Sequence, residues 1–254
     1  MMRKGSRPPW MLSTFWTKAW IAEPQFIDNT SAVATWSPQK GSLAWTQSNS
    51  SNKPTWATNW GHNKGCITFN GSSHYMIADS LASEVTGLQG FTMLVAVEAL
   101  TVTNSTNLAI VHFGHSTSSN TSLTKSSCSP LYISANPFWS CINSDDASHF
   151  SFTTFGSATT GRHVHSSISY PTPSPPTWGA DIDAAYVAGA LTGATLGTQT
   201  LDQATIGAFR GSTVNIYTNC RIRAILFSPN QALAQGTSYY NEVKAAEDYL
   251  VREI

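Results

Sequence analysis

Short apolar runs separated by polar turns fill most of the chain and predict an all-β protein. Residues 91–100 are almost entirely apolar, which is typical of a central strand buried on both faces. A second run of this kind covers residues 108–113. Apolar and polar side chains alternate over residues 150–152 and 163–168, as they do in strands with one buried face. The pattern therefore predicts many strands connected by turns.

Two pairs of neighbouring runs predict β-hairpins. The segments 131–133 and 138–142 are close enough in sequence to fold back on each other. The run at 65–71 ends in Asn-Gly, a strong hairpin signal, so a return strand is expected at 75–78.

The two ends of the chain depart from this pattern. Apolar residues recur at helical spacing over 237–252, which predicts one helix that packs across the β-structure. Residues 1–20 predict an irregular arm, because Pro8 and Pro9 disfavour regular structure. We therefore expect an arm at 1–20 and one domain at 21–254 that includes the helix.

A series of short motifs runs from Trp20 towards the C-terminus in a fixed order. The motifs are Val33-x-x-Trp36, Thr46-Gln47, Pro54-Thr55-Trp56, Phe69-Asn70-Gly71 ahead of Tyr75, Ile206-Gly207-Ala208, Ile222 to Phe227, and Tyr249-Leu250. In this order they resemble the laminin-G-like, concanavalin A-like domains that are common in phage virion proteins and in secreted bacterial proteins. The resemblance implies a two-sheet β-sandwich of the jelly-roll type.

The chain departs from that family at positions that matter for metal binding. Many laminin-G-like domains bind calcium through aspartates. The aspartate expected after the first tryptophan is missing here, and Asn70 stands in place of the usual aspartate in the later motif. The resemblance therefore does not carry calcium binding over to this chain, and we expect no cofactor.

The composition argues against two kinds of partner. Charged residues make up only 11% of the chain and the net charge is zero, so nothing predicts a nucleic-acid interface. No apolar segment is long enough to span a membrane, and no signal peptide is recognisable. Ser and Thr, about a quarter of the chain, supply the polar surface instead. A weakly charged surface suits a subunit of an assembly, and it equally suits a secreted protein.

Catalytic motifs are not evident in the sequence. Glucanases of this fold need carboxylates that alternate on one strand, because one acts as nucleophile and another as acid. The sequence closest to this pattern of alternating carboxylates is Asp181-x-Asp183, and it has no glutamate near it. We therefore expect no catalytic residue and no enzymatic activity.

Histidines and cysteines leave alternatives open. His163 and His165 share a strand face and could hold a metal with a third ligand, although solvent-facing imidazoles are the simpler interpretation. Cys128 and Cys141 could close a hairpin through a disulfide, or they could be buried thiols like the other two cysteines.

Aromatic residues beside prolines and basic residues are the candidate binding groups. Trp139 and Trp178 lie next to prolines or loops and are the candidate glycan ligands. Arg3, Arg7, Trp10 and Trp16 in the arm are candidate contacts to a neighbouring subunit, because Trp and Arg are enriched at interfaces.

These observations lead to one leading hypothesis and two alternatives. The leading hypothesis is a non-enzymatic virion protein, a capsid decoration, head-fibre or tail-associated subunit that forms a homo-oligomer and also binds a host glycan. The first alternative is a free carbohydrate-binding module, and the second is a glucanase-type hydrolase.

Overall fold

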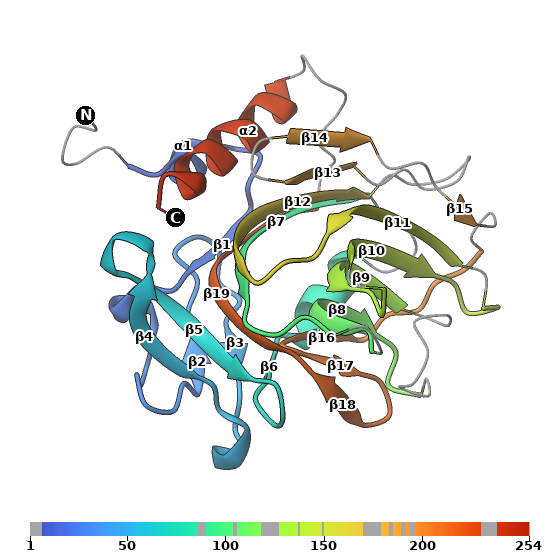
Figure 1. Cartoon of the computed structure of the whole chain (residues 1–254), viewed down its shortest axis with the longest axis horizontal. Coiled ribbons are helices and arrows are strands. Elements are labelled where there is room, and N and C mark those ends of the chain that lie inside the picture. Colours follow the sequence, from blue (N-terminus) through green and yellow to red (C-terminus); the bar gives the residue numbers. More distant parts are fainter. Residues whose placement is uncertain are drawn as a thin grey trace.

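The computed structural model describes most of the chain and shows a two-sheet β-sandwich with one long C-terminal helix (Figure 1). The described residues are 7–85, 90–103, 106–117, 127–136, 138–148, 150–169, 179–182, 185–188, 192–193, 197–229 and 238–253. The predicted fold class is therefore confirmed.

The first sheet has eight strands and a central strand that is buried on both faces. Its order is β14-β13-β12-β7-β19-β5-β4, and β1 also pairs with β19. The strands are β1 (Lys18–Ile21), β4 (Thr55–Trp60), β5 (Lys64–Asn70), β7 (Phe91–Ala99), β12 (Gly161–Ser169), β13 (Gly179–Ile182), β14 (Ala185–Ala188) and β19 (Asn219–Ser228). The expected central strand at 91–100 is β7, between β12 and β19.

The second sheet has nine strands and packs face to face with the first. Its order is β15-β11-β10-β9-β8-β16-β6-β3-β2. The strands are β2 (Thr35–Trp36), β3 (Trp45–Thr46), β6 (Met76–Ile77), β8 (Leu108–Gly114), β9 (Ser127–Ile133), β10 (Phe138–Ser144), β11 (Phe150–Ser157), β15 (Thr192–Gly193) and β16 (Gln203–Ile206). A separate hairpin of β17 (Ala208–Arg210) and β18 (Val214–Tyr217) covers part of its outer face.

One predicted hairpin is confirmed and the other is wrong. Strands β9 and β10 pair antiparallel, as expected. Strand β5 does not return as β6, because β5 pairs with β4 and β19 whereas β6 joins the other sheet. The Asn70 side chain accepts hydrogen bonds from the backbone of Ser72, Ser73 and His74, which widens the turn. The chain thus crosses between the sheets at this point.

An outer layer made from both ends of the chain covers the first sheet. The predicted C-terminal helix is confirmed as α2 (Ser238–Val251). It packs with the short helix α1 (Pro9–Leu12), and Val243, Ala246 and Leu250 share a buried cluster with residues of the sheet. Short 3-10 turns η1 (Pro24–Phe26), η2 (Ser50–Asn52), η3 (Gly61–Asn63) and η4 (Asp79–Glu84) complete the elements.

The helices of the structure do not reach membrane-spanning length. Within the described ranges, none is both long enough and apolar enough to cross a bilayer.

Candidate functional site

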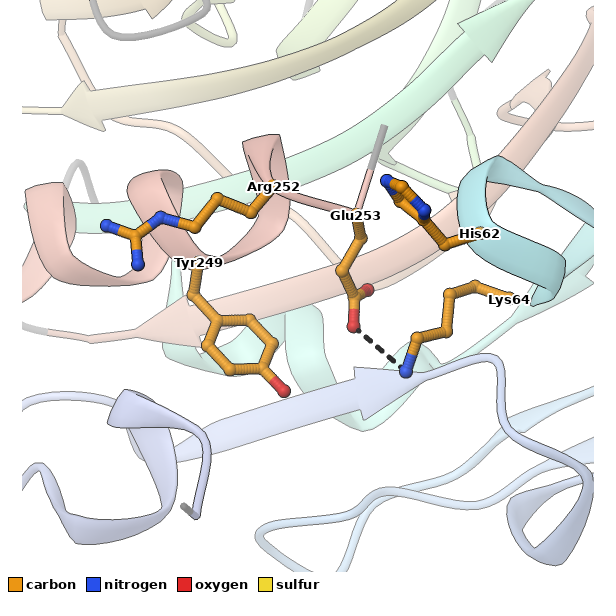
Figure 2. A pocket seen from close by; sticks show the side chains of 5 residues that line it. All are labelled: His62, Lys64, Tyr249, Arg252 and Glu253. Carbon is orange, nitrogen blue, oxygen red and sulfur yellow. Dashed lines mark ion pairs between the residues drawn. The ribbon is translucent and has the colours of Figure 1, made fainter. Parts of the chain in front are cut away.

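A pocket of about 270 Å³ lies where the end of α2 meets the connection between β4 and β5 (Figure 2). We call it the helix pocket. His62, Lys64, Tyr249, Arg252 and Glu253 line it. The first two come from η3 and β5, and the other three come from α2 and the residues that follow it. The pocket therefore depends on the packing of the C-terminal helix against the first sheet.

A second hollow, of about 260 Å³, adjoins the helix pocket and shares Lys64, Tyr249 and Glu253 with it. We call it the arm hollow, because Pro8 and Trp10 of the arm form part of its wall. Each hollow alone is slightly smaller than the ~300 Å³ at which ligand pockets usually begin. Because they share three residues, the two hollows are neighbours, and we call them together the groove.

A β-bulge in β19 positions the charged floor of this groove. The pairing of β19 with β7 skips at Arg223, between Ile222 and Ala224. On its other edge β19 pairs with β5 up to Ile222 and with β1 from Ala224 onward. Arg223 thus lies at the fork between two strands, and its side chain is 2% exposed on the outer face of the sheet.

The buried guanidinium of Arg223 is held by groups from three separate segments. Its Nε donates to Glu253 Oε2 at 2.9 Å, its Nη1 donates to the Gly65 carbonyl at 3.4 Å, and a third nitrogen pairs with Glu23. A buried charge needs such partners, because its desolvation is otherwise costly. Arg223 therefore fixes Glu253, and with it the end of α2, against the sheet.

The helix pocket is lined by two flexible cations, one imidazole, one aromatic ring and the carboxylate of Glu253. Lys64 Nζ lies 3.4 Å from Glu253 Oε1. Figure 2 shows Tyr249 and Lys64 on the two sides of the pocket, with Arg252 extending from the helix beside Tyr249. Arg252 is exposed, and within the described part of the chain it has no ion-pair partner.

The Tyr249 ring forms a rigid wall between the two hollows. Trp10 packs edge-on against it, with the ring centroids 5.0 Å apart. Trp10 in turn donates from Nε1 to Gln39 Oε1 at 2.7 Å. Burial raises the pKa of Tyr249, and the Glu253 carboxylate raises it further, so the phenol remains a hydrogen-bond donor at neutral pH.

This arrangement favours an anionic, hydroxyl-rich ligand. An unpaired guanidinium makes strong, often bidentate, hydrogen bonds with a carboxylate. An aromatic ring offers an apolar face to the carbon skeleton of a sugar, and its hydroxyl offers a polar edge. Glu23 and Glu253 are both held by Arg223 and act as acceptors that orient it.

The expectation that Trp139 is exposed is wrong. Strand β10 begins at Phe138, so the next residue points into the sandwich, and Trp139 is 1% exposed. It packs on His165, with ring centroids 4.4 Å apart. Trp178, the other candidate glycan ligand, lies outside the described residues.

Most of the described arm packs on its own domain rather than projecting outward. Trp10 and Trp16 are at most 1% exposed and belong to the buried cluster under α2. The two prolines start a helix instead of preventing one, because Pro9 occupies the first position of α1, where no backbone N–H is needed. With their indoles buried, these tryptophans are not available to a neighbouring subunit. Arg7 is exposed, and Arg3 lies outside the described residues.

The boundary between arm and sandwich falls earlier than residue 21. Lys18 to Ile21 form β1, which pairs with residues 224–227 of β19. The last residues of the expected arm are thus part of the first sheet.

Among the histidine and cysteine candidates, His163 is half-buried, and His165, Cys128 and Cys141 are buried. His163 and His165 lie on one face of β12 and stack with ring centroids 5.5 Å apart, against Trp139. In the part of the chain that the structure describes, no group of three metal-ligating side chains gathers. Cys128 and Cys141 are free, buried thiols.

Among the residues of the groove, the sequence pointed only to Trp10, as a candidate contact to a neighbouring subunit. His62 and Asn63 both have positive φ angles, of 52° and 57°, which turn the chain sharply ahead of Lys64. Arg223 lies inside the motif from Ile222 to Phe227, which was used only as a sign of the fold. The signal that could have found it is a charged residue inside an otherwise apolar strand, which requires a buried partner.

No protein-family model and no curated protein matches the sequence. Solved structures do match. Trypanosoma rangeli sialidase in complex with 2,3-difluorosialic acid matches with a TM-score of 0.60 at 10% identity, over 95% of this chain and 34% of that one. The Ruminococcus gnavus IT-sialidase CBM40 bound to α2,3-sialyllactose matches with a TM-score of 0.53 at 12% identity, over 74% of this chain and 95% of that one.

The leech intramolecular trans-sialidase complexed with 2,7-anhydro-Neu5Ac also matches, with a TM-score of 0.53 at 11% identity, over 72% of this chain and 27% of that one. The chain thus spans about a third or less of the sialidases that it matches, but nearly the whole of the CBM40 domain. At these identities the matches show the fold, a two-sheet β-sandwich.

Proposed function

We propose that this protein is a carbohydrate-binding β-sandwich whose helix pocket and arm hollow take a glycan that ends in an acidic sugar. The observation that carries the proposal is the exposed, unpaired Arg252 on the Tyr249 side of the pocket, in the described part of the groove. The CBM40 domain with a similar fold is bound to α2,3-sialyllactose, a glycan of this class, which supports the choice.

The proposal assigns each wall of the groove a role. Arg252 binds the carboxylate, and the Tyr249 ring packs against the sugar, whereas Lys64 is paired with Glu253 across the pocket. Arg223 is a positioning residue that acts through Glu253, because its own guanidinium is 2% exposed. The pocket mouth is open to solvent, so salt should weaken binding.

The test compares 3′-sialyllactose with lactose by isothermal titration calorimetry. We expect binding of the sialylated sugar only. Arg252→Ala should lower its affinity at least about tenfold, because a charge-assisted hydrogen bond to a ligand is worth about 1.5–3 kcal/mol. Lys53→Ala, which removes a cation outside the groove, is the matched control and should leave the affinity unchanged. Equal binding of the two sugars, or an Arg252→Ala variant that binds as the wild type does, would refute the proposal.

The absence of catalysis is part of the same proposal. Both described carboxylates of the groove are ion-paired to Arg223, so neither is free to act as nucleophile or acid. The protein should release no fluorophore from 4-methylumbelliferyl α-N-acetylneuraminic acid. Release that Glu253→Gln abolishes would contradict this expectation.

We also propose, from the sequence, that the protein is a structural subunit of a virion. The laminin-G-like motif order and the zero net charge support a subunit of a phage particle. The buried arm removes one of the earlier reasons for expecting assembly. Mass spectrometry of purified particles from the host and sedimentation analysis of the isolated protein test the location and the homo-oligomer.

A further inference from the structure

Two tyrosines form an aromatic pair far from the helix pocket. Tyr217 is the last residue of β18, and Tyr75 lies just ahead of β6. Their ring centroids are 6.2 Å apart with an interplanar angle of 43°, and both side chains are half-buried. In Figure 1 β18 lies at the lower edge of the molecule, whereas the end of α2 lies at the upper left. The pair is therefore separate from the groove.

A strained bulge sets the direction of Tyr217. Ala208 pairs with Tyr217 and Phe209 pairs with Asn215, which leaves Ile216 as the extra residue. Ile216 has a φ of 51°, a left-handed conformation that is costly for a β-branched side chain. Bulges commonly turn a side chain towards a functional surface. Here the bulge brings Tyr217 beside Tyr75.

Tyr75 is held in place by its neighbours. Its backbone N–H donates to the Asn52 carbonyl at 3.2 Å, and its carbonyl accepts from Gln47 Nε2 at 3.0 Å. Asn52 Nδ2 donates to the Tyr75 hydroxyl at 3.4 Å. The turn ahead of it is fixed by the Asn70 side chain. Such a prearranged surface loses little conformational entropy when it binds a ligand.

The polar side chains that hydrogen bond around the pair are two amides and a threonine hydroxyl. Asn52 contacts the pair, and Asn219, two residues after Tyr217, donates to Thr101 Oγ1 at 2.9 Å. Burial raises the pKa of Tyr217, and the neighbouring Tyr75 adds to this effect, so its hydroxyl stays protonated. Amides and phenols pair with sugar hydroxyls, and the rings offer an apolar face.

We infer that Tyr75 and Tyr217 form a second carbohydrate-binding surface, which takes an uncharged oligosaccharide. Two half-exposed rings at an angle suit successive sugar units of a chain better than a single terminal residue. This surface goes beyond the proposed function, because it does not use the helix pocket and takes a different class of sugar.

The experiment uses cellohexaose, xylohexaose and mannohexaose as probes, each titrated into the full chain by calorimetry. We expect at least one to bind. Tyr217→Ala and Tyr75→Ala should each lower its affinity at least about tenfold, because an aromatic contact is worth about a factor of ten. Tyr217→Phe keeps the ring and should retain most of the binding.

Two control variants separate this surface from the groove. Arg252→Ala should leave binding of the neutral sugars unchanged, and so should Tyr239→Ala, which removes a 38% exposed tyrosine from α2. Failure of all three sugars to bind overturns the inference, and so does wild-type affinity in both folded alanine variants. Neither result bears on 3′-sialyllactose, so the two proposals fail separately.

Discussion

His112 on β8 lies between two hydrogen-bonding partners in the interior. Its Nε2 is 3.1 Å from the Arg210 carbonyl, and its Nδ1 is 2.8 Å from Ser129 Oγ. Because a carbonyl oxygen only accepts, Nε2 carries the proton and Nδ1 accepts from the serine hydroxyl. Burial lowers the pKa of His112 to about 3, although the bond to the Arg210 backbone opposes the shift. The imidazole is therefore neutral in the folded protein.

This lowered pKa predicts a loss of stability in mild acid. Below pH 6.5 His112 becomes protonated in the unfolded chain, whereas in the folded protein it stays neutral down to about pH 3. The free energy of unfolding therefore falls as the pH falls. From pH 7 to pH 5 this residue should account for about 2 kcal/mol, measured by urea unfolding. His112→Gln should show a correspondingly flatter pH dependence. An imidazole NMR signal from His112 that titrates near pH 6 would show that the assignment is wrong.

The contacts of single residues explain why the candidate site was missed. Trp139 was expected to be exposed because it follows a proline by two positions, but it is the second residue of β10 and its side chain is buried. Arg223 and Glu253 are 30 positions apart, and Lys64 is farther still. No local pattern predicts that a bulge brings them together. The groove could not be predicted from the sequence because each of its contacts is long-range.

At the scale of elements, the arm and α2 act as one layer. The α1 helix is only four residues long, too short to be stable alone. Its stability comes from Trp10, which packs on Tyr249 of α2 and hydrogen bonds to Gln39. Lys40 Nζ also donates to the carbonyls of Trp10 and Ser13, at 2.9 Å and 2.5 Å.

Trp10→Ala should therefore destabilise the folded protein. Loss of a buried large aromatic side chain typically costs about 3–5 kcal/mol in the free energy of unfolding. Leu12 on the same helix is 70% exposed, so Leu12→Ala is the matched control and should change stability by no more than about 0.5 kcal/mol. Urea unfolding curves measure both. If the two variants are equally stable, α1 contributes nothing to the core.

Elements with a strong local pattern were predicted well. The long apolar run gave β7, the helical spacing gave α2, and the neighbouring runs gave the β9–β10 hairpin. The prediction of a β5–β6 hairpin was wrong because the Asn-Gly signal indicates a turn but not the sheet that the next strand joins. Which sheet a strand joins is decided by contacts distant in sequence.

On the scale of the whole molecule, α1 and α2 add a third layer to the sandwich, over the outer face of the first sheet. The buried cluster of Trp10, Trp16, Leu94, Val243 and Leu250 lies between the first sheet and the outer layer. Without that layer, one face of the sheet would expose a continuous apolar surface, which promotes aggregation.

A chain that ends at Gly236 should therefore be insoluble or greatly destabilised. The truncation uncovers the sheet and also removes Glu253, which leaves the buried guanidinium of Arg223 with fewer partners. Differential scanning calorimetry of any soluble fraction, together with binding of the dye ANS, measures the effect. A melting temperature within a few degrees of the full chain would mean that α2 is dispensable.

The pairing of β1 with β19 sets the order in which the protein can be completed during synthesis. Residues 18–21 are made early, but their partners at 224–227 leave the ribosome more than two hundred residues later. Until β19 has been synthesised, the backbone groups of β1 that pair with it have no partner. Contacts of such high sequence separation also form slowly. Lys18 at the start of that strand discourages pairing with another chain in the interval. The groove, which needs β1, β19 and α2 together, can therefore form only after residues far apart in the sequence have been synthesised.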